Sequence, residues 1–174
     1  FLTRTIGGVP VVVQNCGGEL RAFENQCAHR QMPIQLEDYG RRKPVCRYHG
    51  WVYDDAGAIR SMPDEDVLYR YSAAERAELR LKRFAVRAIG NLVFVNLSPD
   101  PMPIEEQFRP ELMAELENIS GYFSSEAVFA RIPARYNWKL NCENILDFNH
   151  VPYVHPRSFQ PLLPGGVRAP VPTL

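Results

Sequence analysis

The sequence predicts an α+β fold in which an all-β part, residues 1–99, precedes a part that begins with helices, residues 100–174. Short runs rich in β-branched and aromatic residues alternate with Gly-, Asn- and Asp-containing turns up to residue 97. The proline-rich stretch Ser98–Pro103 follows, and beyond it the apolar residues recur at helical spacing. We therefore expect a domain boundary near residue 99.

The expected strands of the first part are paired across turns of recognisable chemistry. Asn15–Gly18, Asp54–Gly57 and Gly90-Asn91 contain the Gly, Asn and Asp residues that tight hairpin turns require. The strands that they separate are Val9–Gln14 with Leu20–Asn25, Val52–Tyr53 with Ala58–Arg60, and Phe84–Ile89 with Leu92–Leu97. A short helix is expected at Ser72–Leu79, where Ser72 and Glu75 form a capping-box pattern.

The second part is expected to begin with a helix, continue as a strand and return to a helix. Ile104–Ile119 carries an apolar stripe typical of a core-facing helix. Val128–Arg135 has strand character, and Tyr136–His150 again has helical spacing. The segment after Pro156 is rich in Pro and Gly and is expected to be a loop. The stripe consists of Phe108, Leu112, Leu116 and Ile119.

Composition excludes some classes of function. Lys plus Arg and Asp plus Glu number 20 each, so the net charge is zero and no basic excess points to nucleic acid. No run of about 18 apolar residues indicates a membrane span. A hydrophobic content of 45% is ample for a globular core.

All four histidines lie in patterns typical of metal ligands. Two short arms, Cys27-Ala-His29 and Cys46-Arg-Tyr-His49, each offer one thiolate and one imidazole. Two Cys and two His can hold a tetrahedral zinc ion or a [2Fe–2S] cluster with two histidine ligands. Zinc fingers usually pair Cys with Cys and His with His, so the mixed arms favour the cluster.

The flanking residues CAHRQM and CRYHGWVYDDAG resemble the two ligand loops of Rieske non-haem iron oxygenase α subunits. The resemblance implies that Cys27, His29, Cys46 and His49 bind a Rieske [2Fe–2S] cluster. Rieske proteins of respiratory complexes carry an additional cysteine in each loop, and neither loop has one here. Cys16 and Cys142 are expected to be free thiols in a reducing, bacterial-type cytoplasm.

The second pattern lies about 100 residues downstream, in the run NWKL-x2-EN-x2-D-x2-HVPYVH. Two histidines and a carboxylate form the ligand set of mononuclear non-haem Fe(II) oxygenases. The run resembles the iron-binding segment of the same family, which implies that His150 and His155 ligate iron. The resemblance assigns Asp147 to a bridge for electron transfer between the two metal centres rather than to the iron. It also places Asn144, preceded by Glu143, near the iron without ligating it.

The resemblance implies an all-β Rieske domain over residues 1–99, followed by the beginning of an α/β helix-grip catalytic domain. It also implies an oxygenase component that accepts electrons at the cluster and activates O2 at the mononuclear iron to oxidise an organic, in particular aromatic, substrate. The expected partners are a reductase, in some systems with a ferredoxin, fed by NAD(P)H, within an α3 or α3β3 assembly. Two alternatives remain: a Rieske ferredoxin-type electron carrier and a zinc-binding interaction module.

The family's third iron ligand is a carboxylate farther downstream, whereas residues 156–174 contain no Asp or Glu. The chain also begins with Phe1 inside an apparent first strand. We therefore expect a fragment of a longer polypeptide. We further expect this fragment to be redox-active at the cluster but inactive as an oxygenase.

Overall fold

The computed structural model describes residues 1–124, 126 and 132–162 of the chain. The chain forms two compact units, Phe1–Ser125 and Glu126–Leu174, which are described separately. The domain boundary expected near residue 99 stays a prediction. Among the described residues, no helix has the length and apolar character needed to cross a membrane.

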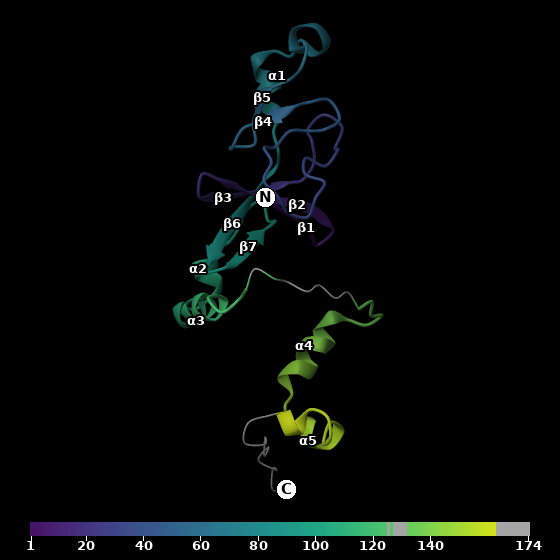
Figure 1. Cartoon of the computed structure of the whole chain (residues 1–174), viewed down its shortest axis with the longest axis vertical. Coiled ribbons are helices and arrows are strands. Elements are labelled where there is room, and N and C mark those ends of the chain that lie inside the picture. Colours follow the sequence, from purple (N-terminus) through teal and green to yellow (C-terminus); the bar gives the residue numbers. More distant parts are fainter. Residues whose placement is uncertain (125, 127–131, 163–174) are drawn as a thin grey trace. The chain divides into compact units, whose positions relative to one another are not determined.

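The first unit is built on an antiparallel sheet of five strands with the order β1-β2-β3-β6-β7 (Figure 1). Gly17 and Gly18 connect β2 to β3 with φ angles of 65° and 101°, as a two-residue hairpin of this twist requires. The expected hairpins are confirmed, with strand ends shifted by a few residues at most. The strands are β1 (Leu2–Ile6), β2 (Val9–Cys16), β3 (Glu19–Glu24), β6 (Arg83–Ile89) and β7 (Leu92–Asn96).

A long excursion between β3 and β6 carries the candidate cluster residues. It contains the two-stranded sheet of β4 (Val52–Tyr53) and β5 (Ile59–Ser61), the π-helix η1 (Glu65–Tyr69) and the helix α1 (Ala73–Glu78). Helix α1 begins as expected, because Ser72 Oγ accepts from Glu75 N at 3.3 Å and Glu75 Oε2 accepts from Ser72 N at 2.8 Å.

The alternation of side chains along the strands creates two cores. Val12 pairs with Phe23 across β2 and β3, and both point to the face on which the excursion packs. Their neighbours Val11, Val13 and Ala22 point to the other face and pack with Phe84. The buried side chains on the excursion side are Val12, Phe23, Cys27, Ile34, Cys46, Trp51, Tyr53, Ile59, Met62 and Leu81. The candidate cysteine ligands are thus part of a hydrophobic core.

The helix expected at Ile104–Ile119 is broken into α2 (Ile104–Gln107) and α3 (Pro110–Ser120). Pro110 disfavours the helical conformation for the residue before it, and Arg109 is extended with ψ of 150°. The expectation that the whole apolar stripe is core was wrong, because Leu112 and Ile119 are 45% and 42% exposed.

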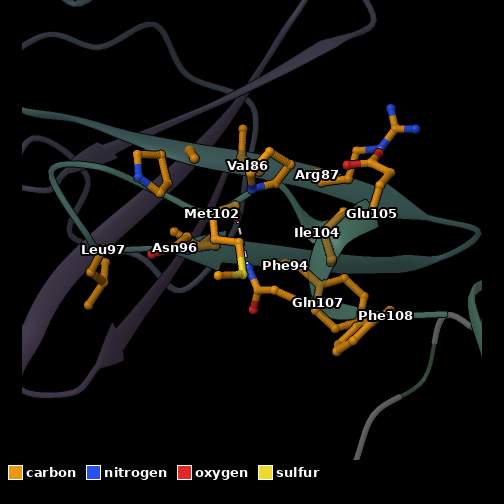
Figure 2. A pocket seen from close by; sticks show the side chains of 14 residues that line it. Val86, Arg87, Phe94, Asn96, Leu97, Met102, Ile104, Glu105, Gln107 and Phe108 are labelled. Carbon is orange, nitrogen blue, oxygen red and sulfur yellow. Dashed lines mark hydrogen bonds and ion pairs between the residues drawn. The ribbon is translucent and has the colours of Figure 1, made fainter.

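Phe108 alone among the stripe's residues makes an aromatic contact with the sheet. Its ring meets Phe94 of β7 edge-on, with centroids 5.6 Å apart, and Glu105 pairs with Arg87 of β6 at 3.2 Å. These contacts hold α2 beside the β6–β7 hairpin, around a pocket of about 470 Å³ (Figure 2).

The second unit contains α4 (Trp138–Leu146), α5 (Val151–Val154) and the 3-10 turn η2 (Gln160–Leu162). The expected helix Tyr136–His150 therefore ends four residues early, because Asp147 is extended with ψ of 92° and closes a turn through its side chain. In the expected strand Val128–Arg135, residues 128–131 lie outside the described residues and 132–135 have no regular structure. The expected loop after Pro156 contains η2.

Gly57 provides a test of how tightly the excursion packs on the sheet. A Cβ at Gly57 would lie 2.7 Å from the Phe23 ring, and the φ of +79° is unfavourable for other residues. We predict that Gly57→Ala lowers the free energy of unfolding by about 3 kcal/mol, from overpacking added to backbone strain. Gly18→Ala is the matched control, because its φ is +101° and nothing lies within 4 Å. Gly18→Ala should lower the free energy of unfolding by about 1 kcal/mol, with both variants measured by urea titration. Equal losses in the two variants would contradict the close packing of Gly57 against Phe23.

Candidate metal centres

Two turns of the same construction present the four candidate cluster residues. In the first turn, Cys27 N donates to Met32 O and Gln31 N donates to Cys27 O, both at 2.8 Å. In the second, Cys46 N donates to Trp51 O and Gly50 N donates to Cys46 O, both at 2.9 Å. Both turns thus link the cysteine to the residues four and five positions later, and each histidine lies inside its turn.

The equivalent fourth positions after each cysteine, Gln31 and Gly50, have left-handed φ angles of 57° and 71°. Gly50 satisfies this conformation without strain, whereas Gln31 is a residue that rarely adopts it. A left-handed residue ends each turn and directs the chain back into the core. The glycine at position 50 indicates a left-handed residue from the sequence alone, whereas the glutamine at position 31 does not.

The cysteines and histidines differ in burial. Cys27 and Cys46 are 2% and 1% exposed, whereas His29 and His49 are half-buried. The imidazole rings lie together, with centroids 4.5 Å apart. Burial, with the Cys46 thiol nearby, raises the pKa of the Cys27 thiol. The two sulfurs therefore form the inner end of the site and the two imidazoles its outer end.

Buried polar atoms of the site test whether these residues fit a [2Fe–2S] cluster. His29 Nδ1 is buried and has no hydrogen-bond partner among the described residues. Its ring stacks on Trp51, with centroids 4.7 Å apart and an interplanar angle of 9°, which fixes the ring orientation. A buried imidazole nitrogen without a partner is costly unless a ligand occupies it. The donor set of two thiols and two imidazoles fits the cluster.

Protonation also suits metal binding at the imidazole end. Burial, with His49 and Arg30 nearby, lowers the pKa of His29. The neutral imidazole therefore prevails at neutral pH, and only this form ligates a metal. Burial raises the pKa of Cys27, so the thiol keeps its proton until a metal ion replaces it.

Tyr53 contacts the cysteine end and was not anticipated from the sequence as a site residue. Its hydroxyl lies 3.1 Å from Cys27 Sγ and accepts a hydrogen bond from Ala28 N at 2.9 Å. Burial, with the Cys27 thiol beside it, raises the pKa of the Tyr53 phenol, so the hydroxyl remains protonated. Tyr53 can therefore donate to a Cys27 thiolate.

Aromatic rings surround the imidazoles. Tyr48 stacks on His49 with centroids 4.0 Å apart and is itself 58% exposed. Tyr69 of η1 meets His29 edge-on at 5.6 Å. Trp51 is fully buried and shields its side of the imidazoles, whereas Tyr48 is exposed and leaves the other side open to solvent.

The second unit brings Asp147, His150 and His155 together around the end of α4. Asp147 Oδ2 lies 3.4 Å from His150 Nδ1, and Asp147 Oδ1 accepts from Asn149 N at 2.9 Å. The rings of His150 and His155 have centroids 5.5 Å apart. The turn after Leu146, rather than one continuous helix face, makes Asp147 and His150 neighbours.

A mainly apolar pocket of about 360 Å³ is lined by both histidines, Asp147 and Asn144. Glu143 is exposed and is not among the pocket's lining residues. The apolar part of the lining consists of Ile145, Phe148, Val151 and Phe159. In the part of the chain that the structure describes, no group of three or more His, Cys, Asp or Glu side chains could hold a metal ion.

Residues 1–75 match the family model of the Rieske [2Fe-2S] domain. The N-terminal part of this chain is therefore a Rieske domain, in agreement with its antiparallel sheet and the paired Cys–His turns.

The homologues of the chain are Rieske oxygenase α subunits. The glycine betaine monooxygenase oxygenase subunit of Pseudomonas aeruginosa is 31% identical over 94% of this chain and 37% of that protein. The α subunit 2 of terephthalate 1,2-dioxygenase from Comamonas sp. is 31% identical over 89% of this chain and 39% of its own length.

Solved structures agree in fold. A quaternary ammonium Rieske monooxygenase superposes with a TM-score of 0.76 at 22% identity, over 91% of this chain and 44% of the other. A naphthalene 1,2-dioxygenase with bound indole gives a TM-score of 0.67 at 27% identity, over 92% of this chain and 37% of the other. The chain thus spans less than half the length of the relatives it matches.

Tyr53 supplies a test of the cysteine end. A hydrogen bond to sulfur that strengthens by about 1 kcal/mol on one-electron reduction raises the reduction potential by roughly 40 mV. We predict that Tyr53→Phe lowers the potential of the reconstituted protein by roughly this amount, measured by redox titration of the visible spectrum. Tyr71→Phe is the control, because Tyr71 stacks on Tyr69 rather than contacting a cysteine. Equal potentials in wild type and Tyr53→Phe would contradict the hydrogen bond.

Proposed function

We propose that Cys27 and Cys46 bind one iron of a Rieske [2Fe–2S] cluster and that His29 and His49 bind the other. The observation that carries this assignment is the pair of equivalent turns, which bury both thiols and leave His29 Nδ1 without a partner. Neutral imidazoles in place of two thiolates make the cluster easier to reduce. Trp51 and Tyr69 orient the His29 ring, and the Tyr53 hydroxyl would donate a hydrogen bond to the Cys27 thiolate.

The wider function that we propose is the oxygenase component of a Rieske-type system. A mononuclear Fe(II), held by His150 and His155, would supply the activation of O2 for oxidation of an organic substrate. The names of the relatives support aromatic or quaternary ammonium substrates, by dioxygenation or monooxygenation. The proposed partners are a reductase, with or without a ferredoxin, fed by NAD(P)H, within an α3 or α3β3 assembly.

Asp147 has a specific part in this proposal. The Asp147 carboxylate lies 3.4 Å from His150 Nδ1, which would favour the tautomer with its proton on Nδ1 and leave Nε2 free for iron. The hydrogen bond from Asn149 N keeps the carboxylate in place. The resemblance to the family adds the role of a bridge to the cluster of a neighbouring subunit. Asn144 lines the same pocket and would lie near the iron.

The cluster assignment is tested by anaerobic reconstitution with iron and sulfide. The wild-type chain should bind about two irons and two sulfides and give a Rieske-type EPR signal when reduced. Cys46→Ser should lose the cluster, because serine offers no thiolate. Cys16→Ser is the matched control, because Cys16 lies at the end of β2 outside both turns. A diamagnetic wild-type protein with one zinc ion would refute the assignment and favour the zinc-binding module.

The same preparation tests the expectation that this chain alone is redox-active but inactive as an oxygenase. His150 and His155 alone should bind Fe(II) weakly, because no Asp or Glu follows His155. Incubation with O2, a chemical reductant and candidate aromatic or quaternary ammonium substrates should yield no product. Hydroxylated product from the 174-residue chain would contradict this expectation.

Asp147→Asn tests the role of the carboxylate. We predict that His150 of the metal-free wild-type chain carries its proton on Nδ1 and that the substitution weakens this preference, since an amide can donate to the same nitrogen. Nitrogen-15 NMR of the imidazole measures the tautomer, and Glu143→Gln is the control, because Glu143 does not line the pocket of His150. In an assembled oxygenase, Asp147→Asn should retain both irons but slow electron transfer by orders of magnitude. Unchanged single-turnover rates would exclude the bridge.

A further inference from the structure

We infer that Arg42, Asn25 and Gln35 form a non-covalent clamp that joins the two cluster-binding turns and sets their separation. The inference deepens the cluster assignment and rests on it for the functional consequence. None of the three residues belongs to the Cys–His motifs. The clamp lies between the turn that starts at Cys27 and the segment that leads into Cys46.

Asn25 secures the end of the first turn. Its Oδ1 accepts from Ile34 N at 3.0 Å and from Gln35 N at 2.9 Å, and its Nδ2 donates to Gln35 O at 2.8 Å. Asn25 is 6% exposed, so these bonds are shielded from water. They tie the residue two positions before Cys27 to the chain beyond the turn. The first turn is thereby closed as a loop from Asn25 to Gln35.

Gln35 connects this closed loop to the second segment. It is 2% exposed, and its Nε2 donates to Arg42 O at 3.2 Å and to Lys43 O at 3.4 Å. A buried amide whose two ends are both satisfied by the neighbouring segment has one well-defined position. The backbone at residues 42–43 is therefore held at a fixed distance from the first loop.

Arg42 completes the clamp from the other direction. Its Nη1 donates to Ile34 O at 3.0 Å and to Gln35 Oε1 at 3.1 Å, and its Nη2 donates to Val45 O. One planar guanidinium thus bonds both loops at once, and its last acceptor belongs to the residue immediately before Cys46. Charge-assisted bonds of this kind are stronger than neutral ones.

The clamp adds to the other contacts between the two turns. These are the stacking of His29 on Trp51, the contacts of the Tyr53 hydroxyl with Cys27 and Ala28, and the ion pair of Arg47 with Glu37. The described cysteines are free, so no disulfide links them. The turns lie outside the five-stranded sheet, and the bridge of Val45 to Val52 closes the second turn without reaching the first. A cluster held by four side chains requires both turns at one separation, and outer contacts of ligands commonly set such geometry. Arg42 is therefore a positioning residue.

The test compares Arg42→Met with Arg41→Met, the same substitution on the adjacent, exposed arginine. In the metal-free 174-residue chain, amide hydrogen exchange at Ile34, Gln35 and Cys46 should become about tenfold faster in Arg42→Met and stay unchanged in Arg41→Met. Arg42→Lys should also exchange faster, because a lysine cannot bond both loops. Equal exchange in the Arg42 and Arg41 variants would overturn the clamp, whichever metal the protein binds.

The reconstituted proteins give the second readout. Arg42→Met and Arg42→Lys should lose iron to a chelator about 10-fold to 100-fold faster than wild type and show broadened EPR lines, whereas Arg41→Met should match wild type. Identical chelation rates and spectra in all four proteins would overturn the positioning role. A wild-type protein that takes up only zinc would refute the cluster assignment, and the exchange result would still decide the clamp.

Discussion

The separation of two short turns governs what the first unit can bind, because each turn delivers one thiol and one imidazole. Within each turn the backbone supplies the order, through the hydrogen bonds of Cys27 and Cys46 with the residues that follow them. Between the turns the order comes from side chains, through the contacts of Asn25, Gln35 and Arg42. The sheet beneath contributes a rigid apolar floor, Val12 and Phe23, against which Trp51 and Tyr53 pack. The backbone hydrogen bonds of the turns, the side-chain clamp between them and the apolar residues of the sheet thus all restrain the positions of the four candidate ligands.

The two units differ in how much of their apolar surface is buried by their own residues. In the first unit the candidate ligands are embedded in a packed core. In the second unit, α4 exposes Trp138 by 69%, Leu140 by 61% and Leu146 by 74%, and only Val151 is buried among its described residues. Exposed apolar surface of this kind normally lies against other protein. The pair of His150 and His155 therefore lies on a segment that exposes much of its apolar surface.

Much of the first unit could be predicted from local signals. Gly17-Gly18 and Gly90-Asn91 are turn signals strong enough to locate two hairpins, and the Ser72–Glu75 pair located α1. The cluster residues were predicted by their motifs, and the structure brings their side chains together. The contact of Tyr53 with Cys27 was not predictable, because tyrosine in a strand next to a ligand loop carries no signal for the direction of its hydroxyl. The break before Pro110 could have been found, since proline restricts the residue that precedes it.

The end of α4 shows a different limit. Periodicity placed Asp147 and His150 on one helix face, and the two side chains are indeed neighbours, but through a turn. Residues three apart meet in a helix and also in an Asx-type turn, so spacing alone does not distinguish the two. The local competition between Asp147 and the backbone decided the outcome.

For the proposed cluster, the difference in burial between the sulfur end and the imidazole end would affect the rate of electron transfer. Water beside Tyr48 and His49 must reorient whenever the charge at that end changes, and this reorganisation adds to the activation free energy of transfer. A surface that covers the two rings removes that water and lowers the barrier. Electron transfer to an oxidant in solution, which does not displace this water, would have the higher activation free energy. For the proposed cluster, solvation of this exposed edge would thus make electron transfer faster within a complex than outside it.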